Sequence, residues 1–111
     1  MSTNAFTPCG NTITFTANVS GSVPTPSQAL SNTLGGNQYR IVNTGSVTVF
    51  LGVGVTSALA TTNAVVVSSS QISIPIIAGT VEVLTFNPNA YFTGITSSGT
   101  AVVYVTPGDG L

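Results

Sequence analysis

Short runs in which apolar and polar residues alternate, each ended by Gly, Pro or Asn, most constrain the fold of this chain. Residues 13–19 read Ile-Thr-Phe-Thr-Ala-Asn-Val, so every second side chain of an extended strand is apolar. Residues 47–55 alternate in the same way. The second face of that strand carries Gly52 and Gly54, which favour close approach of another backbone or a bulge. The pattern is typical of all-β proteins.

Further strands are expected at residues 39–42, 65–67, 72–76, 81–86, 91–96 and 101–106. Pro75 interrupts its strand on one side, so that strand should be bulged or lie at a sheet edge. The last two strands predict a hairpin across Ser97-Ser98-Gly99. Residues 56–64 and the Pro-containing residues 21–28 predict loops, and residues 29–34 either a short strand or a helical turn.

Seven to eight short strands in 111 residues predict one domain: an antiparallel, jelly-roll-like β-sandwich over residues 1–111. Within it, residues 1–12 are interpreted as an N-terminal arm. Residues 107–111 (Pro-Gly-Asp-Gly-Leu) are interpreted as a C-terminal tail that stops the final strand.

Charge is almost absent: Arg40, Glu82 and Asp109 are the charged residues, and the sequence has no Lys and no His. Nucleic acid and anionic lipid both attract clustered Lys and Arg, so neither is expected as a partner. The N-terminal residues lack the basic and apolar regions of a secretory signal, and the apolar runs are too short to span a membrane. We therefore expect synthesis and assembly in a cytoplasm.

The same inventory predicts that the protein is not an enzyme. General acid–base catalysis would have to use Glu82, Asp109, Cys9 or a tyrosine, and no spacing pairs the two carboxylates. Glu82 alternates with valines on a strand and should face solvent. Cys9, between Pro8 and Gly10, is interpreted as a free thiol; an interchain bridge or a nucleophile are the alternatives, although a nucleophile would lack a base. No cofactor and no metal site are expected.

Arg40 is the candidate partner contact. Its guanidinium could bind a carboxylate or a chain terminus of a partner through two hydrogen bonds. The alternatives are an intrachain pair with Glu82, or a solvated head on an apolar stem.

Missing charge also leaves strand edges without their usual protection. Soluble β proteins protect exposed edges with Lys, Pro, bulges or inward-pointing charges. Residues 47–55 and 102–105 are uncharged and β-prone, which makes them aggregation-prone in isolation. Either closure of the sheet or a partner must cover such edges. An uncharged interface of this kind avoids the desolvation of ions and should depend little on salt.

Several short sequence segments resemble segments of one group of viral proteins. They are residues 40–43 (Arg-Ile-Val-Asn), 47–52 (Val-Thr-Val-Phe-Leu-Gly), 77–83 (Ile-Ala-Gly-Thr-Val-Glu-Val) and 103–111 (Val-Tyr-Val-Thr-Pro-Gly-Asp-Gly-Leu). The chain from residue 40 onward resembles the small capsid decoration, or cement, proteins of tailed bacteriophages. The resemblance implies a β-sandwich or jelly roll that binds the outer capsid surface, often as a trimer or dimer, and holds neighbouring capsomers together. No family residue set is transferred.

Three functional hypotheses follow. The first is a structural virion protein that binds the major capsid protein and stabilises the shell, as a homo-oligomer (dimer or trimer) on the capsid surface. The second is a glycan- or receptor-binding module of a phage fibre, for which residues 87–92 (Asn-Pro-Asn-Ala-Tyr-Phe) are the best candidate loop. The third is a capsid shell subunit.

Overall fold

The computed structural model describes residues 6–19, 23–30, 37–66 and 70–110. These residues form nine strands and one short helix, so the expectation of an all-β protein is confirmed. The strands are β1 (Phe6–Pro8), β2 (Ile13–Val19), β3 (Ser27–Gln28), β4 (Gln38–Asn43), β5 (Val49–Gly54), β6 (Ser73–Ile76), β7 (Val81–Thr85), β8 (Tyr91–Thr96) and β9 (Ala101–Gly110). The helix α1 (Ser57–Asn63) lies between β5 and β6.

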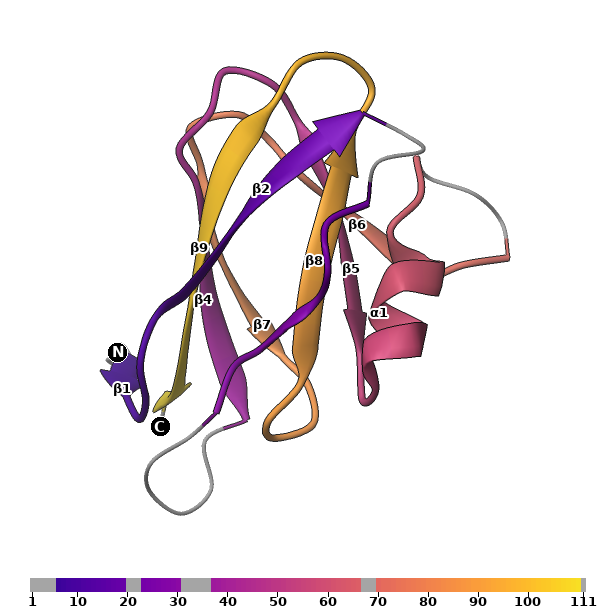
Figure 1. The fold of residues 1–111 in the computed structure, drawn as a ribbon. Coiled ribbons are helices and arrows are strands. Elements are labelled where there is room, and N and C mark those ends of the chain that lie inside the picture. The colour runs from indigo at the N-terminus through magenta and orange to yellow at the C-terminus, as the bar shows by residue number, and fades with distance from the viewer. Residues whose placement is uncertain (1–5, 20–22, 31–36, 67–69, 111) are drawn as a thin grey trace.

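The strands make one mixed sheet in the order β6-β5-β8-β2-β9-β4-β7, which curls until it is nearly closed into a barrel (Figure 1). The short strands β1 and β3 pair with β9 and β8. β2 joins the two halves: it runs parallel to β8 at Asn18 and Val19 and antiparallel to β9 over residues 13–17. The two ends of the sheet are therefore β6 and β7, which follow each other in the chain but are not paired.

The core lies between the two halves, because alternate residues of each strand point inward. The fully buried large apolar side chains of the strands come from both halves, and they include Tyr39, Ile41, Val49, Leu51, Ile76, Phe92, Val103 and Val105. The rings of Tyr39 and Phe92 meet edge to face across the core, with centroids 4.8 Å apart. Burying each such side chain contributes about 1.5–3 kcal/mol to folding.

The predicted loop at residues 56–64 is wrong, because this segment contains α1. Thr56 caps the helix by accepting a hydrogen bond from the backbone N–H of Leu59 (3.2 Å). The helix has two turns, too few to show a helical period in the sequence. It packs on the glycine face of β5: a Cβ on Gly52 would lie 2.3 Å from the carbonyl oxygen of Ala60, and one on Gly54 2.6 Å from the nitrogen of Ala60. The close backbone approach expected from these glycines is confirmed.

Other local expectations need correction. The last two strands do not form a hairpin: β8 pairs with β5 and β2, while β9 pairs with β2 and β4. Val65 and Val66 lie in a bend rather than a strand, and Val67 is outside the described residues. β3 occupies part of the predicted loop at residues 21–28, and of residues 29–34 only Ala29 and Leu30 are described. The edge position expected from Pro75 is confirmed.

The predicted arm and tail pair with each other. Phe6, Thr7 and Pro8 lie opposite residues 110, 109 and 108, so β9 continues past the proline that was expected to end it. Pro107 can offer only its carbonyl group, and that oxygen accepts a hydrogen bond from the backbone N–H of Cys9 (2.8 Å).

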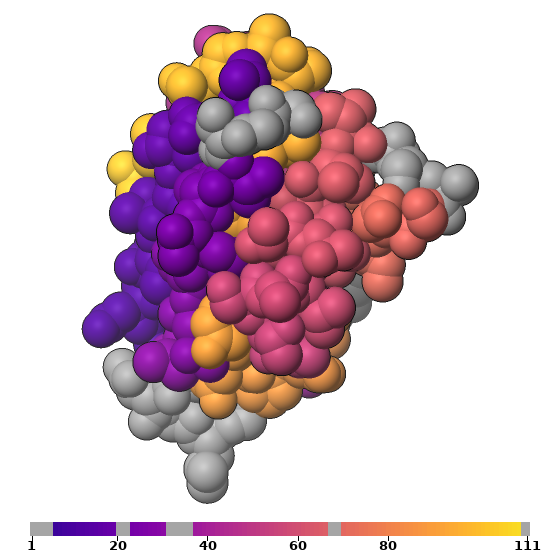
Figure 2. Space-filling model, turned by 45° about the vertical axis from the view of Figure 1, so that its right-hand side comes forward, coloured from indigo at the N-terminus to yellow at the C-terminus, as the bar shows by residue number. Residues whose placement is uncertain are grey.

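The two outer surfaces of the sheet differ. Residues 23–30 and α1 cover the β5–β8 side, where they lie next to each other on the surface (Figure 2). Thr93 of β8, fully buried beneath them, donates a hydrogen bond to the carbonyl oxygen of Pro24 (2.8 Å). No described element covers the outer side of β2, β9, β4 and β7.

Candidate interaction surface

The uncovered side of the sheet carries a group of exposed apolar residues. Strand register places Val81, Val42 and Tyr104 side by side on β7, β4 and β9. Val83 lies two residues after Val81 on β7, and Val102 lies two residues before Tyr104 on β9, so both point to the same side of the sheet. Val81, Val83, Val102 and Tyr104 are 36–50 % exposed. We call these four residues, together with Val42, the valine–tyrosine face.

Arg40 lies within this face. It is exposed, and its register neighbours are Val83 on β7 and Thr106 on β9. Glu82 lies opposite Ile41, whose side chain is fully buried, so Glu82 and Arg40 point to opposite sides of the sheet. The structure therefore argues against the intrachain Arg40–Glu82 pair. The other two interpretations, a partner contact and a solvated head, stay open.

Within the described part of the chain, β7 pairs with a neighbouring strand, β4, on one side only. Asn43 donates its backbone N–H to the carbonyl oxygen of Thr80 (3.1 Å), and Phe86 donates its backbone N–H to the carbonyl oxygen of Asn37 (2.9 Å). Both bonds continue the β4–β7 register. In an antiparallel pair of strands, every second residue pair is hydrogen-bonded. Because residues 80 and 86 are bonded to residues 43 and 37, residues 82 and 84 between them also direct their backbone N–H and C=O groups toward β4. The N–H and C=O groups of Val81, Val83 and Thr85 consequently point away from the sheet.

The other end of the sheet is better protected. Pro75 of β6 has no N–H to offer a neighbouring strand. β6 and β7 are joined by a tight turn in which Thr80 donates its N–H to Ile77 (3.2 Å), with Gly79 at a φ of 72°. From this turn the two strands diverge into opposite halves of the sheet (Figure 1). We call the region between the unpaired edge of β7 and the β5–β6 pair the wedge.

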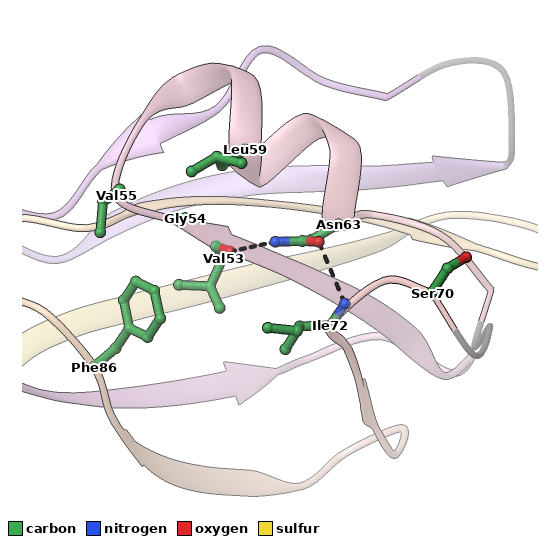
Figure 3. A pocket seen from close by; sticks show the side chains of 8 residues that line it. All are labelled: Val53, Gly54, Val55, Leu59, Asn63, Ser70, Ile72 and Phe86. Carbon is green, nitrogen blue, oxygen red and sulfur yellow. Dashed lines mark hydrogen bonds between the residues drawn. The ribbon is translucent and has the colours of Figure 1, made fainter.

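A pocket of about 310 Å³ lies at the wide end of the wedge. Val53, Val55, Leu59, Ile72 and Phe86 supply most of its apolar lining, and Gly54, Asn63 and Ser70 complete it (Figure 3). The Asn63 side chain fixes one wall: its Nδ2 donates to the carbonyl oxygen of Val53 (3.0 Å), and its Oδ1 accepts from the N–H of Ile72 (3.3 Å). The lining has no titratable side chain, so the pocket suits an apolar group.

The side chains considered for acid–base or nucleophilic catalysis lie on different elements of the fold. Glu82 is exposed at the wedge, as expected, while Asp109 lies opposite Thr7 in the β1–β9 pair. Cys9 is half-buried, and its Sγ donates to the carbonyl oxygen of Thr7 (3.4 Å). Among the residues that the structure describes, no three His, Cys, Asp or Glu side chains lie close enough together to bind a metal ion.

The loop considered for glycan binding is held by the core. Tyr39 donates its hydroxyl hydrogen to the carbonyl oxygen of Asn87 and accepts from the N–H of Ala90 (3.2 Å). Burial raises the pKa of Tyr39, and its hydrogen bonds to the loop backbone partly oppose this increase. Phe92 is fully buried and Tyr91 half-buried, so this loop does not present the exposed aromatic pair that a sugar ring would need.

Sequence reasoning identified Arg40 but neither the free edge of β7 nor the pocket. Both depend on which strands pair, which the local pattern does not specify. The alternation of Val81 and Val83 with Glu82 did not reveal the valine–tyrosine face, because the pattern does not show that both valines are exposed.

No family model, curated protein or solved structure matches the chain. Within the described ranges, no helix combines the length and the apolar character needed to cross a membrane.

Proposed function

We propose that this protein is a structural virion protein that binds the outer surface of a capsid and stabilises the shell through protein–protein contacts. The observation that carries the proposal is the valine–tyrosine face, an exposed apolar surface with one charged residue in it, Arg40. The assignment of the partner as a major capsid protein comes from the sequence resemblance. The site of action is then the virion surface, reached after assembly in a host cytoplasm.

The composition of the face supports a binding role. Exposed apolar patches on soluble proteins commonly mark interaction sites, and tyrosine and arginine are enriched among residues that dominate binding energy. The face has no carboxylate, so docking does not require desolvating an acidic group. Arg40 is the residue we assign to a carboxylate or chain terminus of the partner.

Shell stabilisation would follow from mass action. A protein that binds the assembled shell but not its dissociated subunits stabilises the shell by its binding free energy, and many symmetric copies multiply the effect. We further propose that the chain acts as a homo-oligomer, a dimer or trimer. Its fold would be a jelly-roll-like sandwich, in which the β6-β5-β8 layer packs on the β2-β9-β4-β7 layer through contacts such as Tyr39 with Phe92.

Co-sedimentation with shells that lack the protein tests the proposal. We expect saturable binding and a higher temperature of shell disassembly. Tyr104→Lys should weaken binding at least about tenfold, because it places an unpaired charge in an apolar contact. Thr61→Lys is the matched control: it adds the same charge to an exposed position of α1, on the covered side of the sheet, and should bind normally.

Charge reversal tests the role of Arg40. Arg40→Glu should weaken shell binding if the guanidinium contacts a partner carboxylate, and should leave binding unchanged if it is a solvated head. Failure of the unmodified protein to co-sediment, with binding to host cells or glycans instead, would support the fibre module and reject the proposal. Assembly of the chain alone into closed shells would identify it as a shell subunit.

A further inference from the structure

The free edge of β7 has the properties of a docking site for an extended segment of another protein. Its N–H and C=O groups at Val81, Val83 and Thr85 point outward at the spacing that a neighbouring strand would satisfy. Unlike β6, this strand contains no proline. Strand addition to such an edge is a recurrent mode of peptide recognition, in which main-chain hydrogen bonds supply affinity and alternate side chains supply specificity.

The side chains along the inner side of β7 specify what the added strand should carry. Residues 82, 84 and 86 share this side, which faces the wedge. Leu84 is half-buried against the core, and Phe86 lines the pocket. Apolar side chains opposite these two residues would extend the core and enter the pocket. Glu82 provides the third, charged position.

The charge of Glu82 indicates whether a second copy of the chain or a different protein binds at the edge of β7. Among the residues that the structure describes, no cation lies beside Glu82, since Arg40 lies on the other side of the sheet and the sequence has no Lys. A second copy paired antiparallel through its own β7 has no cation to place opposite Glu82 in any register. In the register centred on Val83 it would place Leu84 opposite Glu82 and bring the two carboxylates to diagonal positions, which is unfavourable. A strand from another protein can instead place Lys or Arg opposite Glu82.

We propose that β7 binds an extended segment of a partner protein with the pattern apolar-x-apolar-x-Lys/Arg, antiparallel to β7. The cation lies opposite Glu82, the middle apolar residue opposite Leu84, and the first apolar residue opposite Phe86 at the pocket. The inference rests on the proposed function for the kind of partner, a structural protein, and it adds the chemistry of the contacting segment.

The test uses a capped peptide, Ser-Val-Thr-Val-Thr-Lys-Ser, titrated into the isotope-labelled full chain and followed by amide NMR. We expect saturable shifts at Val81, Val83 and Thr85, with protection of their N–H groups from exchange. A peptide with Glu in place of Lys should bind about two- to fivefold more weakly, the range of an exposed ion pair. The Glu82→Lys protein should reverse this preference.

A backbone variant separates strand pairing from side-chain contact. Val83→Pro removes an outward N–H without removing a bond to β4, and should abolish peptide binding. Val83→Thr keeps the N–H and a β-branched side chain, and should bind normally. If Val83→Pro does not fold, the charge reversal in Glu82→Lys decides alone.

Shifts confined to other residues, or equal affinity for the Lys and Glu peptides, would overturn the inference. Concentration-dependent shifts of the β7 amides without peptide would identify a second copy at the edge and also overturn it. If the peptide does not bind but the protein still co-sediments with shells, the edge inference fails and the proposed function stands. If the peptide binds but shells do not, the proposed function fails and the edge inference stands.

Discussion

Gly52 sets the distance between β5 and α1. A Cβ at this position would meet main-chain atoms at 2.3 Å and 2.5 Å, the carbonyl oxygen of Ala60 and the nitrogen of Ala64, which cannot rotate away as a side chain would. We expect Gly52→Ala to lower the free energy of unfolding by about 2–3 kcal/mol, the upper part of the range for overpacking. Urea denaturation measures this.

Gly79→Ala is the comparison for that variant. Its Cβ would have no atom within 4 Å, and its φ of 72° is the only cost. We expect a loss of about 1 kcal/mol. Equal losses for the two variants would show that α1 does not depend on Gly52.

Tyr39 links the core to the turn before β8, and its burial predicts a pH dependence. Because its pKa is raised in the folded protein, the unfolded chain loses this proton first as pH rises. The contribution is therefore fully present below the ordinary tyrosine pKa near 10 and is lost as pH rises through the higher folded pKa. We expect Tyr39→Phe to cost about 1–2 kcal/mol at neutral pH, through two lost hydrogen bonds. Urea titrations from neutral to strongly alkaline pH should show a smaller decrease for the variant than for the parent.

At the scale of single residues, the sequence predicted what depends on local alternation. Phe15 and Ala17 are buried as their strand pattern indicated, and Gly52 and Gly54 do accept a close backbone. The hydroxyl of Tyr39 could not be placed from the sequence, because its partners lie 48 and 51 positions away along the chain.

At the scale of elements, α1 depends on its cap. Thr56 satisfies one of the free N–H groups of the first turn, and a helix of seven residues has few other bonds. Thr56→Ala should cost about 1 kcal/mol. Thr61→Ala, at an exposed position inside the helix, should be neutral or stabilising by up to about 0.5 kcal/mol. Denaturant midpoints compare the two, and a larger loss for Thr61→Ala would contradict the capping role.

The edge strand β7 predicts an alternating pattern of amide exchange in the free protein. The N–H groups of Glu82 and Leu84 point to β4 and should exchange slowly, while those of Val81, Val83 and Thr85 should exchange rapidly. Hydrogen–deuterium exchange followed by NMR resolves single residues. Uniform protection along the strand would mean that another strand already occupies the edge.

Element type was more predictable than element pairing. The turn signal Ser97-Ser98-Gly99 is correct, yet it fits a connection between the two halves of the sheet as well as a hairpin. β2 lies between β8 and β9, an arrangement fixed by contacts far apart in sequence. The pocket and the free edge of β7 arise from the same non-local choice, which explains why neither was predicted.

At the scale of the whole molecule, the structure shows where the few charged residues lie. The three charged residues lie apart: Arg40 on the outer face, Glu82 at the wedge and Asp109 beside β1. The remaining outer face of β2, β9, β4 and β7 presents valine, tyrosine and threonine. A surface of this kind gains little from long-range attraction and depends on apolar contact over its area.

Salt should therefore have little effect on shell binding. Between about 0.05 and 0.5 M sodium chloride we expect the dissociation constant to change less than about threefold, because at most one or two exposed ion pairs are screened. Sulfate salts, which strengthen the burial of apolar surface, should tighten binding. Co-sedimentation at graded salt concentrations measures both effects. Arg40→Glu provides the comparison, since a new unpaired carboxylate in the contact should make binding weaker and more salt-dependent. A loss of affinity of tenfold or more for the unmodified protein over the chloride range would mean that charged groups, rather than the valine–tyrosine face, dominate the contact.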